Sequence, residues 1–204
     1  MSLFTFDETK AMETTGGNSL GKVLDSGVYD IEILTASKTI ASTGTTGIDW
    51  SFQVDGAKYP NHIYGMWVAK ADGTPIFNMA VVQNLMGILG IKELTEYDKT
   101  IEVKDGTKVV KAFKELDNVK CKAAIQKVYG FYNGEVTEKN EFKMFFSMDC
   151  KTYAEMKSNS DPKQCKYFEE KLADKYDKDY LKAQADGLLD GKTEDAEETT
   201  TSLL

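Results

Sequence analysis

The chain has 204 residues, 41% of them hydrophobic, and a formal net charge of −8. This length and composition predict one ordinary domain with an appendage, and they exclude global disorder. No run of 18 apolar residues and no basic-then-apolar N-terminus occurs, so we expect neither a membrane span nor a secretory signal. The three cysteines, Cys121, Cys150 and Cys165, have unrelated spacings that favour a reducing cytosol and argue against a disulfide framework.

The charge is distributed unevenly along the chain. Residues 99–127 contain eight lysines and four acids, whereas residues 185–204 contain six acids and Lys192 as the one base. All 25 basic residues are lysines, which excludes the bidentate recognition of phosphate or guanine that arginine provides. Because lysines are flexible point charges, any phosphate binding by this chain should depend little on nucleotide sequence.

The first part of the chain predicts an arm followed by three strands. Residues 1–26 are polar and contain several glycines, which is typical of an irregular arm. Residues 27–36 and 48–54 alternate apolar and polar side chains with the period of two expected of strands, and residues 62–70 predict a third strand. The segment 37–47 between the first two strands is rich in Gly and Thr and predicts a loop.

The hydrophobic period changes after the third strand. Residues 75–90 place apolar side chains at helical spacing between a proline and glycines, which predicts a helix. Asp105-Gly106 then indicates a small hairpin. Residues 117–129 alternate again and predict a strand.

A hairpin closes the predicted set of strands. Asn133-Gly134 tolerates the positive φ that a tight turn needs, and it leads into a last strand over residues 141–148. Residues 151–184 are rich in helix formers and charge and predict a helical extension. Residues 185–204 predict a disordered acidic tail.

The order of three strands, a helix and two strands predicts the fold. It is the order of the OB-fold, so we expect a mainly β protein with a five-stranded OB-fold-like barrel over residues 27–150 and a helix between strands 3 and 4. The alternative is another β-barrel or sandwich with one helix.

Motifs for catalysis or metal binding are missing from the sequence. The single histidine, His62, is more often structural than a base when no partner motif accompanies it. Residues 187–193 imitate a phosphate-binding loop but have too few residues between their glycines, and the cysteine spacings fit no zinc knuckle or ribbon. We therefore expect a protein that is not an enzyme and that has no cofactor or metal.

Aromatic side chains crowd the tip of the last hairpin, where water-facing positions need none. Tyr129, Phe131 and Tyr132 lie there, and in an OB-fold the loops after strands 1 and 4 flank the binding face. Exposed rings stack on bases of any identity, and each stack is worth about 1–3 kcal/mol. The rings therefore predict a stacking platform for a single strand, with the alternative that they fold back over the barrel end as a small core.

Lysines and one tryptophan extend this predicted surface. Lys120 and Lys122 lie on the polar face of their strand, where they could hold phosphates, and Trp67 faces either the core or the binding surface. The predicted DNA-binding residues are Lys38, Trp67, Lys120, Lys122, Tyr129, Phe131, Tyr132 and Lys143.

Four segments carry a family resemblance: the strand GVYDIEILTAS, the amphipathic FNMAVVQNLMGILGI, LDNVKCKAAIQKV before the hairpin, and the acidic EDAEE. Over about residues 25–150 and the tail, the chain resembles phage-encoded single-stranded DNA-binding proteins of the OB-fold type. The resemblance implies a protein that coats and protects single-stranded DNA during phage replication, recombination and repair in the host cytoplasm. The alternative function is a phage structural or host-protein-interaction protein that uses the same barrel.

The resemblance also implies a role for the tail in binding phage polymerase, helicase or recombination proteins. Tails in the family often end in an aromatic residue, whereas this chain ends in TTTSLL, so two leucines would supply the apolar anchor. The tail could also compete with DNA for the lysines, or it could only keep the protein soluble. The predicted partner-binding residues are Glu194, Asp195, Glu197, Glu198, Leu203 and Leu204.

Overall fold

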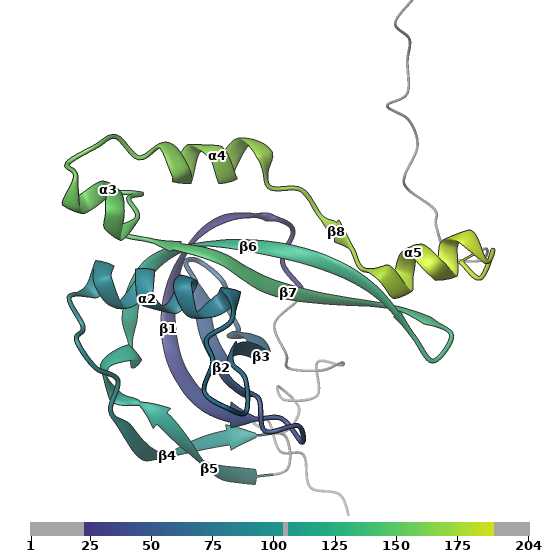
Figure 1. Ribbon diagram of the computed structural model, residues 1–204, viewed down its shortest axis with the longest axis horizontal. Coiled ribbons are helices and arrows are strands. Elements are labelled where there is room, and N and C mark those ends of the chain that lie inside the picture. The colour runs from purple at the N-terminus through teal and green to yellow at the C-terminus, as the bar shows by residue number, and fades with distance from the viewer. Residues whose placement is uncertain (1–22, 104–105, 190–204) are drawn as a thin grey trace, which may run out of the picture.

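The computed structural model describes residues 23–103 and 106–189, which form a mainly β protein (Figure 1). The strands are β1 (Gly27–Ile40), β2 (Thr46–Val54), β3 (Asn61–Ala69), β4 (Glu96–Val103), β5 (Gly106–Phe113), β6 (Val119–Tyr132), β7 (Glu135–Phe146) and β8 (Lys175–Tyr176). The helices are α2 (Phe77–Leu89), the short 3-10 helix η1 (Lys114–Leu116), α3 (Tyr153–Lys157), α4 (Lys163–Lys171) and α5 (Lys178–Ala185).

The described strands belong to one sheet. A hydrogen-bonded path runs β3-β2-β1-β5-β4, and β6 pairs with β1, β7 and β8. All of these pairs are antiparallel except β6–β8. The sheet is not closed into a barrel, and β3 and β7 are the two strands that face each other at the open side.

The mainly β prediction is confirmed, but the predicted five-stranded OB-fold-like barrel is not what the structure shows. The described part of the chain has eight strands, because the additional strands β4 and β5 pair with each other and β5 pairs with β1, and because β8 adds to the edge of β6. The predicted loop 37–47 is mostly strand, since its β-branched Thr39 and Ile40 extend β1 to pair with β2. The segment between the strands predicted over 117–129 and 141–148 is likewise paired strand on both sides of the Asn133-Gly134 turn.

Helix α2 lies where the sequence predicts it and bridges the open side of the sheet at one end. The helix ends at Gly90, which has φ +68° and donates its amide to the carbonyl of Gly87. The Asn84 side chain donates to the Phe145 carbonyl on β7 at 2.7 Å and accepts from the Tyr153 amide at 2.9 Å. These bonds fix α2 against β7 and α3.

Aromatic rings from β2 and β7 form the centre of the core. Trp50 and Phe52 are buried, as predicted, and Trp50 meets Phe142 edge-on with ring centroids 5.6 Å apart. Val81 and Leu85 of α2 belong to the same cluster.

No helix in the described part of the chain is long and apolar enough to cross a membrane.

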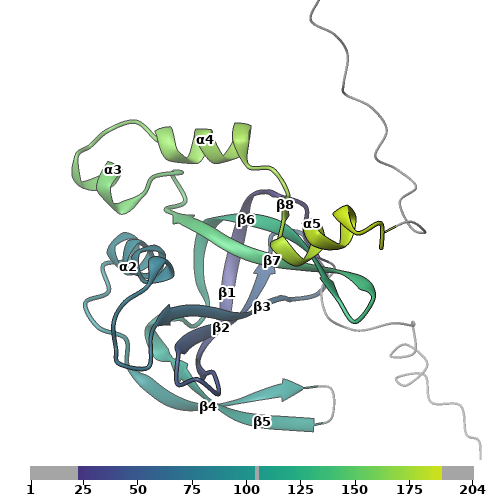
Figure 2. The same cartoon turned by 45° about the vertical axis from the view of Figure 1, so that its right-hand side comes forward.

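The C-terminal segment runs along the β6–β7 hairpin on the side away from β2 and β3 (Figure 2). Cys165 and Phe168 of α4 pack against Phe146 there. A disulfide joins Cys165 to Cys150, with Cα atoms 5.6 Å apart, whereas Cys121 is free and buried. The disulfide departs from the expectation, because spacing along the sequence does not reveal that α4 returns to the end of β7.

Candidate nucleic-acid interface

The outer face of β3 carries a row of rings. Ile63, Met66 and Val68 point into the core, while His62, Tyr64 and Trp67 lie on the opposite face. Tyr64 is 67% exposed, and its ring stacks on that of His62 with centroids 5.8 Å apart and an interplanar angle of 6°. Burial lowers the pKa of His62, so the imidazole beneath Tyr64 is held toward its neutral form.

The indole of Trp67 lies over two glycines. A Cβ atom on Gly47, the residue opposite Trp67 on β2, would come within 2.7 Å of the indole Cε3 atom. A Cβ atom on Gly65 would come within 3.0 Å of the indole Cζ2 atom. The missing side chains at these two positions therefore create the flat floor on which the ring rests.

A β-bulge turns Trp67 outward. The pairing of β2 with β3 passes from Ile48–Met66 to Trp50–Ile63, so Tyr64 and Gly65 together oppose Asp49. Gly65 has φ +64°, and its amide donates to the Asp49 carboxylate at 2.7 Å. Burial and then the charge of Asp49 raise the pKa of Tyr64, so the phenol stays protonated well above neutral pH.

A second bulge, on β7, faces the first. The pairing of β6 with β7 passes from Ala124–Met144 to Ile125–Phe142, which leaves Lys143 as the extra residue. Nearby, the Lys139 ammonium pairs with the Glu141 carboxylate at 3.1 Å. Lys143 takes part in none of the ion pairs found among the described residues of β7.

A groove of about 500 Å³ lies between these two bulged strands. Its walls are residues 63–67 of β3 and 139–143 of β7, and Thr39, Asp49 and Asn78 complete it. The groove thus combines the exposed Tyr64 ring and the half-buried Trp67 ring with two lysines, two carboxylates and two side-chain amides. This arrangement can stack flat apolar rings and hold an anionic backbone beside them.

Of the predicted DNA-binding residues, the structure brings Trp67 and Lys143 together in this groove. The other predicted lysines lie against acids. Lys38 pairs with Glu96 on β4 at 2.7 Å, and the remaining two form a ladder with acids of β1. That ladder consists of Lys120 with Glu32 and Lys122 with Asp30.

The three predicted rings of the hairpin tip have different surroundings. Tyr129 stacks on Tyr176 of β8, with centroids 5.1 Å apart and an interplanar angle of 13°, and also contacts Tyr180 of α5. The Lys127 ammonium lies over the Tyr129 ring, 4.8 Å from its centroid, and 3.3 Å from the Glu138 carboxylate, and Tyr129 and Glu138 raise the pKa of that lysine. Phe131 is half-buried, whereas Tyr132 is 70% exposed. The small-core alternative therefore describes Tyr129, and Tyr132 is the ring that faces water.

Sequence reasoning missed Tyr64 and Lys139. In the strand HIYGMWVAK, strict alternation places Tyr64 on the outer face if Ile63 faces the core. The same alternation then places Trp67 in the core, so it cannot predict both rings on the outer face. Gly65 between them was the available signal, since an isolated glycine in a strand often marks a bulge.

The predicted partner-binding residues of the tail lie outside the described residues. Among those that are described, Cys150, Cys165 and Glu169 form the group of side chains that could hold a metal ion, and they lie at α4 away from the groove. No protein-family model matches this chain, and no curated protein is significantly similar to it.

Proposed function

We propose that this protein binds single-stranded DNA, with little sequence preference, in the groove between β3 and β7. The observation that carries the proposal is the placement of Tyr64 and Trp67 on one wall and Lys143 on the other. Rings can stack on any base, and an ammonium group can hold any phosphate. Because the chain has no arginine, its polar contacts to the strand are sequence-tolerant point charges.

The topology supports an OB-fold-related assignment. Strands β1, β2, β3, β6 and β7 lie in the order β3-β2-β1-β6-β7, and α2 follows β3. These are the five strands and the helix of the predicted barrel, enlarged by the β4–β5 hairpin. In OB-folds the face of strands 2 and 3 binds oligonucleotides, and that face carries Trp67 here.

In this proposal the protein covers single strands exposed during phage DNA replication, recombination and repair, and it protects them from nucleases and re-annealing. Its acidic C-terminal residues recruit replication or recombination proteins. The protein performs no chemistry on the strand, so affinity and salt dependence are the quantities that report its function.

Intrinsic fluorescence gives a direct test. The chain has two tryptophans, and Trp50 is 1% exposed, so Trp67 is the indole that a ligand in the groove can reach. Titration with oligo-dT at low and high salt should quench this fluorescence, and the apparent affinity should fall as salt rises. In Trp67→Phe the quenching should disappear while a dye-labelled oligo-dT still binds.

Two alanine variants distinguish DNA binding in the groove from DNA binding elsewhere on the surface. Trp67→Ala should weaken binding of labelled oligo-dT by about 1–3 kcal/mol, the value of one lost stack. Tyr167→Ala is the matched control, because Tyr167 is 59% exposed on α4, away from the groove. Equal affinities for the two variants, or binding that does not respond to salt, would refute the proposal.

A further inference from the structure

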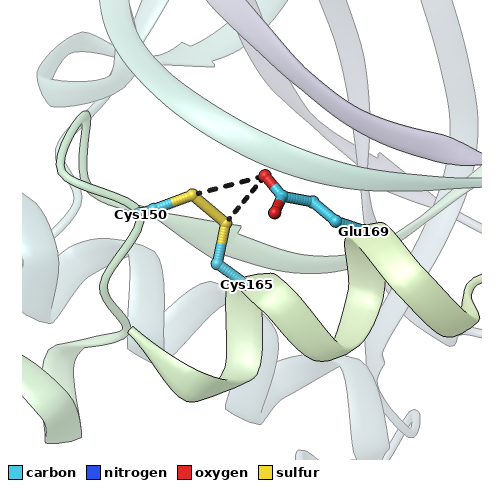
Figure 3. Close-up of side chains that lie close together, drawn as sticks. All are labelled: Cys150, Cys165 and Glu169. Atoms are coloured by element: carbon cyan, nitrogen blue, oxygen red, sulfur yellow. Dashed lines mark hydrogen bonds between the residues drawn. A yellow bond between two sulfur atoms is a disulfide. The ribbon is translucent and has the colours of Figure 1, made fainter. Parts of the chain in front are cut away.

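Three side chains far from the groove converge on one point. Cys150 follows β7, while Cys165 and Glu169 lie one turn apart on α4 (Figure 3). The Glu169 Oε1 atom lies 3.9 Å from the Cys150 sulfur and 3.7 Å from the Cys165 sulfur. The i and i+4 positions of a helix share a face, which is why both α4 residues point at Cys150.

The backbone aims Cys150 at this point. Cys150 has φ +64°, a left-handed conformation that residues with side chains seldom adopt. A tight turn holds it there, since its amide donates to the Ser147 carbonyl at 2.9 Å and the Ser147 amide donates to the Lys151 carbonyl at 2.8 Å. Unusual backbone of this kind is concentrated at functional sites.

The Glu169 carboxylate can interact favourably with Cys150 and Cys165 when these two cysteines are reduced. A disulfide has no S–H group, so Glu169 receives no hydrogen bond from it. Two thiols could both donate to Oε1, and two thiolates could share a cation with it. The exposed carboxylate thus gains a chemical partner at this point only when the S–S bond is open.

The distances suit a tetrahedral cation. With Zn–S bonds of about 2.3 Å and a Zn–O bond of about 2.0 Å, neighbouring ligand atoms of a tetrahedron lie roughly 3.5–3.8 Å apart. Glu169 Oε1 is already close to this separation from both sulfurs, so only the two sulfurs must move apart. All three ligand atoms lie within 4.8 Å of one another.

We propose that the reduced chain binds a thiophilic divalent cation of the zinc class through Cys150, Cys165 and Glu169, with water at the fourth position. A low-molecular-weight thiol supplies the electrons: its two molecules lose two hydrogens and form a disulfide, while the protein S–S bond breaks and two S–H groups form. The cation then displaces the two thiol protons. Soft thiolates select zinc over magnesium or calcium.

This site links the end of β7 to α4 in a reducing environment, where a disulfide would be lost. Cys165 is fully buried and packs beside Phe146, whereas Glu169 is exposed. A cation can therefore enter from the Glu169 side. The proposal does not depend on DNA binding, because the site and the groove share no residue.

The test uses the full chain, reduced with a phosphine that is then removed, and Zn²⁺ alone as the probe. Competition with a chromophoric chelator should show one Zn²⁺ per reduced chain and none per oxidised chain. Cobalt substitution should give the absorption band of thiolate-to-metal charge transfer. Glu169→Gln should weaken Zn²⁺ affinity at least about tenfold, and Glu170→Gln, on the same helix, should leave it unchanged.

Cys165→Ser should abolish stoichiometric binding, and Cys150→Ser serves the same purpose if the buried serine prevents folding. Added Zn²⁺ should also raise the melting temperature of the reduced wild type and not that of Glu169→Gln. The proposal is overturned if the reduced wild type takes up no more Zn²⁺ than the cysteine variants. It is equally overturned if Glu169→Gln and Glu170→Gln bind Zn²⁺ alike.

Discussion

Trp67 owes its position to two neighbours that lack side chains. Gly47 and Gly65 leave the space that the indole covers, and the positive φ of Gly65 permits the bulge that turns the ring outward. Lys143 occupies the corresponding place on the opposite wall, at the bulge of β7. The groove therefore results from two bulges in otherwise regular strands.

The floor beneath Trp67 can be filled by one methyl group. Gly47→Ala places a Cβ atom 2.7 Å from the indole, so the ring must move, and the free energy of oligo-dT binding should weaken by about 1–3 kcal/mol, the value of one stack. Tryptophan emission should change with it. Gly27→Ala on β1 is the control, since its Cβ atom would meet a movable tyrosine ring at 3.3 Å. Unaltered emission and affinity in Gly47→Ala would contradict this view of the floor.

The lowered pKa of His62 predicts how the free energy of unfolding depends on pH. Because the folded-state pKa lies below the ordinary 6.5, the unfolded chain binds more protons as the pH falls through 6.5, and the free energy of unfolding decreases until the folded-state pKa is reached. The one histidine gives one imidazole Hε1 resonance, and its NMR titration midpoint should lie below 6.5 in the folded protein. His62→Gln should flatten this part of the stability profile. A midpoint at or above 6.5 would show that the imidazole is not desolvated.

The C-terminal segment packs against the β6–β7 hairpin. Strand β8 adds to the edge of β6, and Tyr176 and Tyr180 cover Tyr129. The Asp177 amide donates to the Tyr129 carbonyl at 2.9 Å, and the Asp177 side chain caps α5. The segment therefore stiffens the base of the tip and leaves Tyr132 outside.

Two tyrosines of one hairpin should respond differently to truncation. Tyr129→Ala removes a ring stacked between strand and helix, so the free energy of unfolding should fall by about 1–2 kcal/mol. Tyr132→Ala should change it by less than about 0.5 kcal/mol, because that side chain is 70% exposed. Urea denaturation measures both variants. Similar losses would mean that the tip is one packed unit.

Sequence periodicity was sufficient for elements whose pattern is unbroken. The alternation of Ile48, Trp50 and Phe52 and the helical spacing of Val81 and Leu85 gave β2 and α2 correctly. It was insufficient where a bulge shifts the phase, as at Gly65, because one extra residue exchanges the two faces of a strand. It also gave no information about partners distant in sequence, such as Glu32 for Lys120 or Tyr176 for Tyr129.

Across the molecule, some lysines lie in ion pairs with acids, and acids outnumber bases overall. The ladder between β1 and β6 places Lys120 and Lys122 beside acids, whereas the ion pairs of the described residues of β7 do not include Lys143. The chain nevertheless has a formal net charge of −8. In the proposed function, long-range repulsion of DNA by this net charge must be overcome locally in the groove, so the affinity should depend strongly on salt.

The salt dependence of binding should identify the lysines that hold phosphate. Lys143→Ala should reduce the slope of log affinity against log salt by about 0.7, the value for one contact on a single strand. Replacing Lys120 and Lys122 together should reduce it less, because each already has a carboxylate partner. Lys166→Ala on α4 is the control. A larger effect from the ladder pair than from Lys143 would move the interface to the β1–β6 face.

Truncation after Leu189 tests the acidic end of the chain. It removes five acids and one lysine, so the formal net charge changes from −8 to −4. Oligo-dT affinity should rise, most at low salt, because the Debye length at 0.15 M is only about 8 Å. Melting temperature should not change, since the described fold ends before the cut. If affinity at low salt is the same for both chains, the acidic residues do not compete with DNA.

The pairing of β1 with β6 also determines when the sheet can be completed during synthesis of the chain. Gly27 pairs with Ile125, so the central strand waits about a hundred residues for its partner, which at 5–20 residues per second is roughly 5–20 s of synthesis. During that interval the β1–β3 meander can form from local contacts, but one edge of β1 stays open on the ribosome. Completion of the sheet then needs a long loop to close, and such non-local strand pairing is slow. The strands of the β6–β7 hairpin are joined by a two-residue turn. The open edge of β1 is covered once this hairpin has been synthesised and has paired with it.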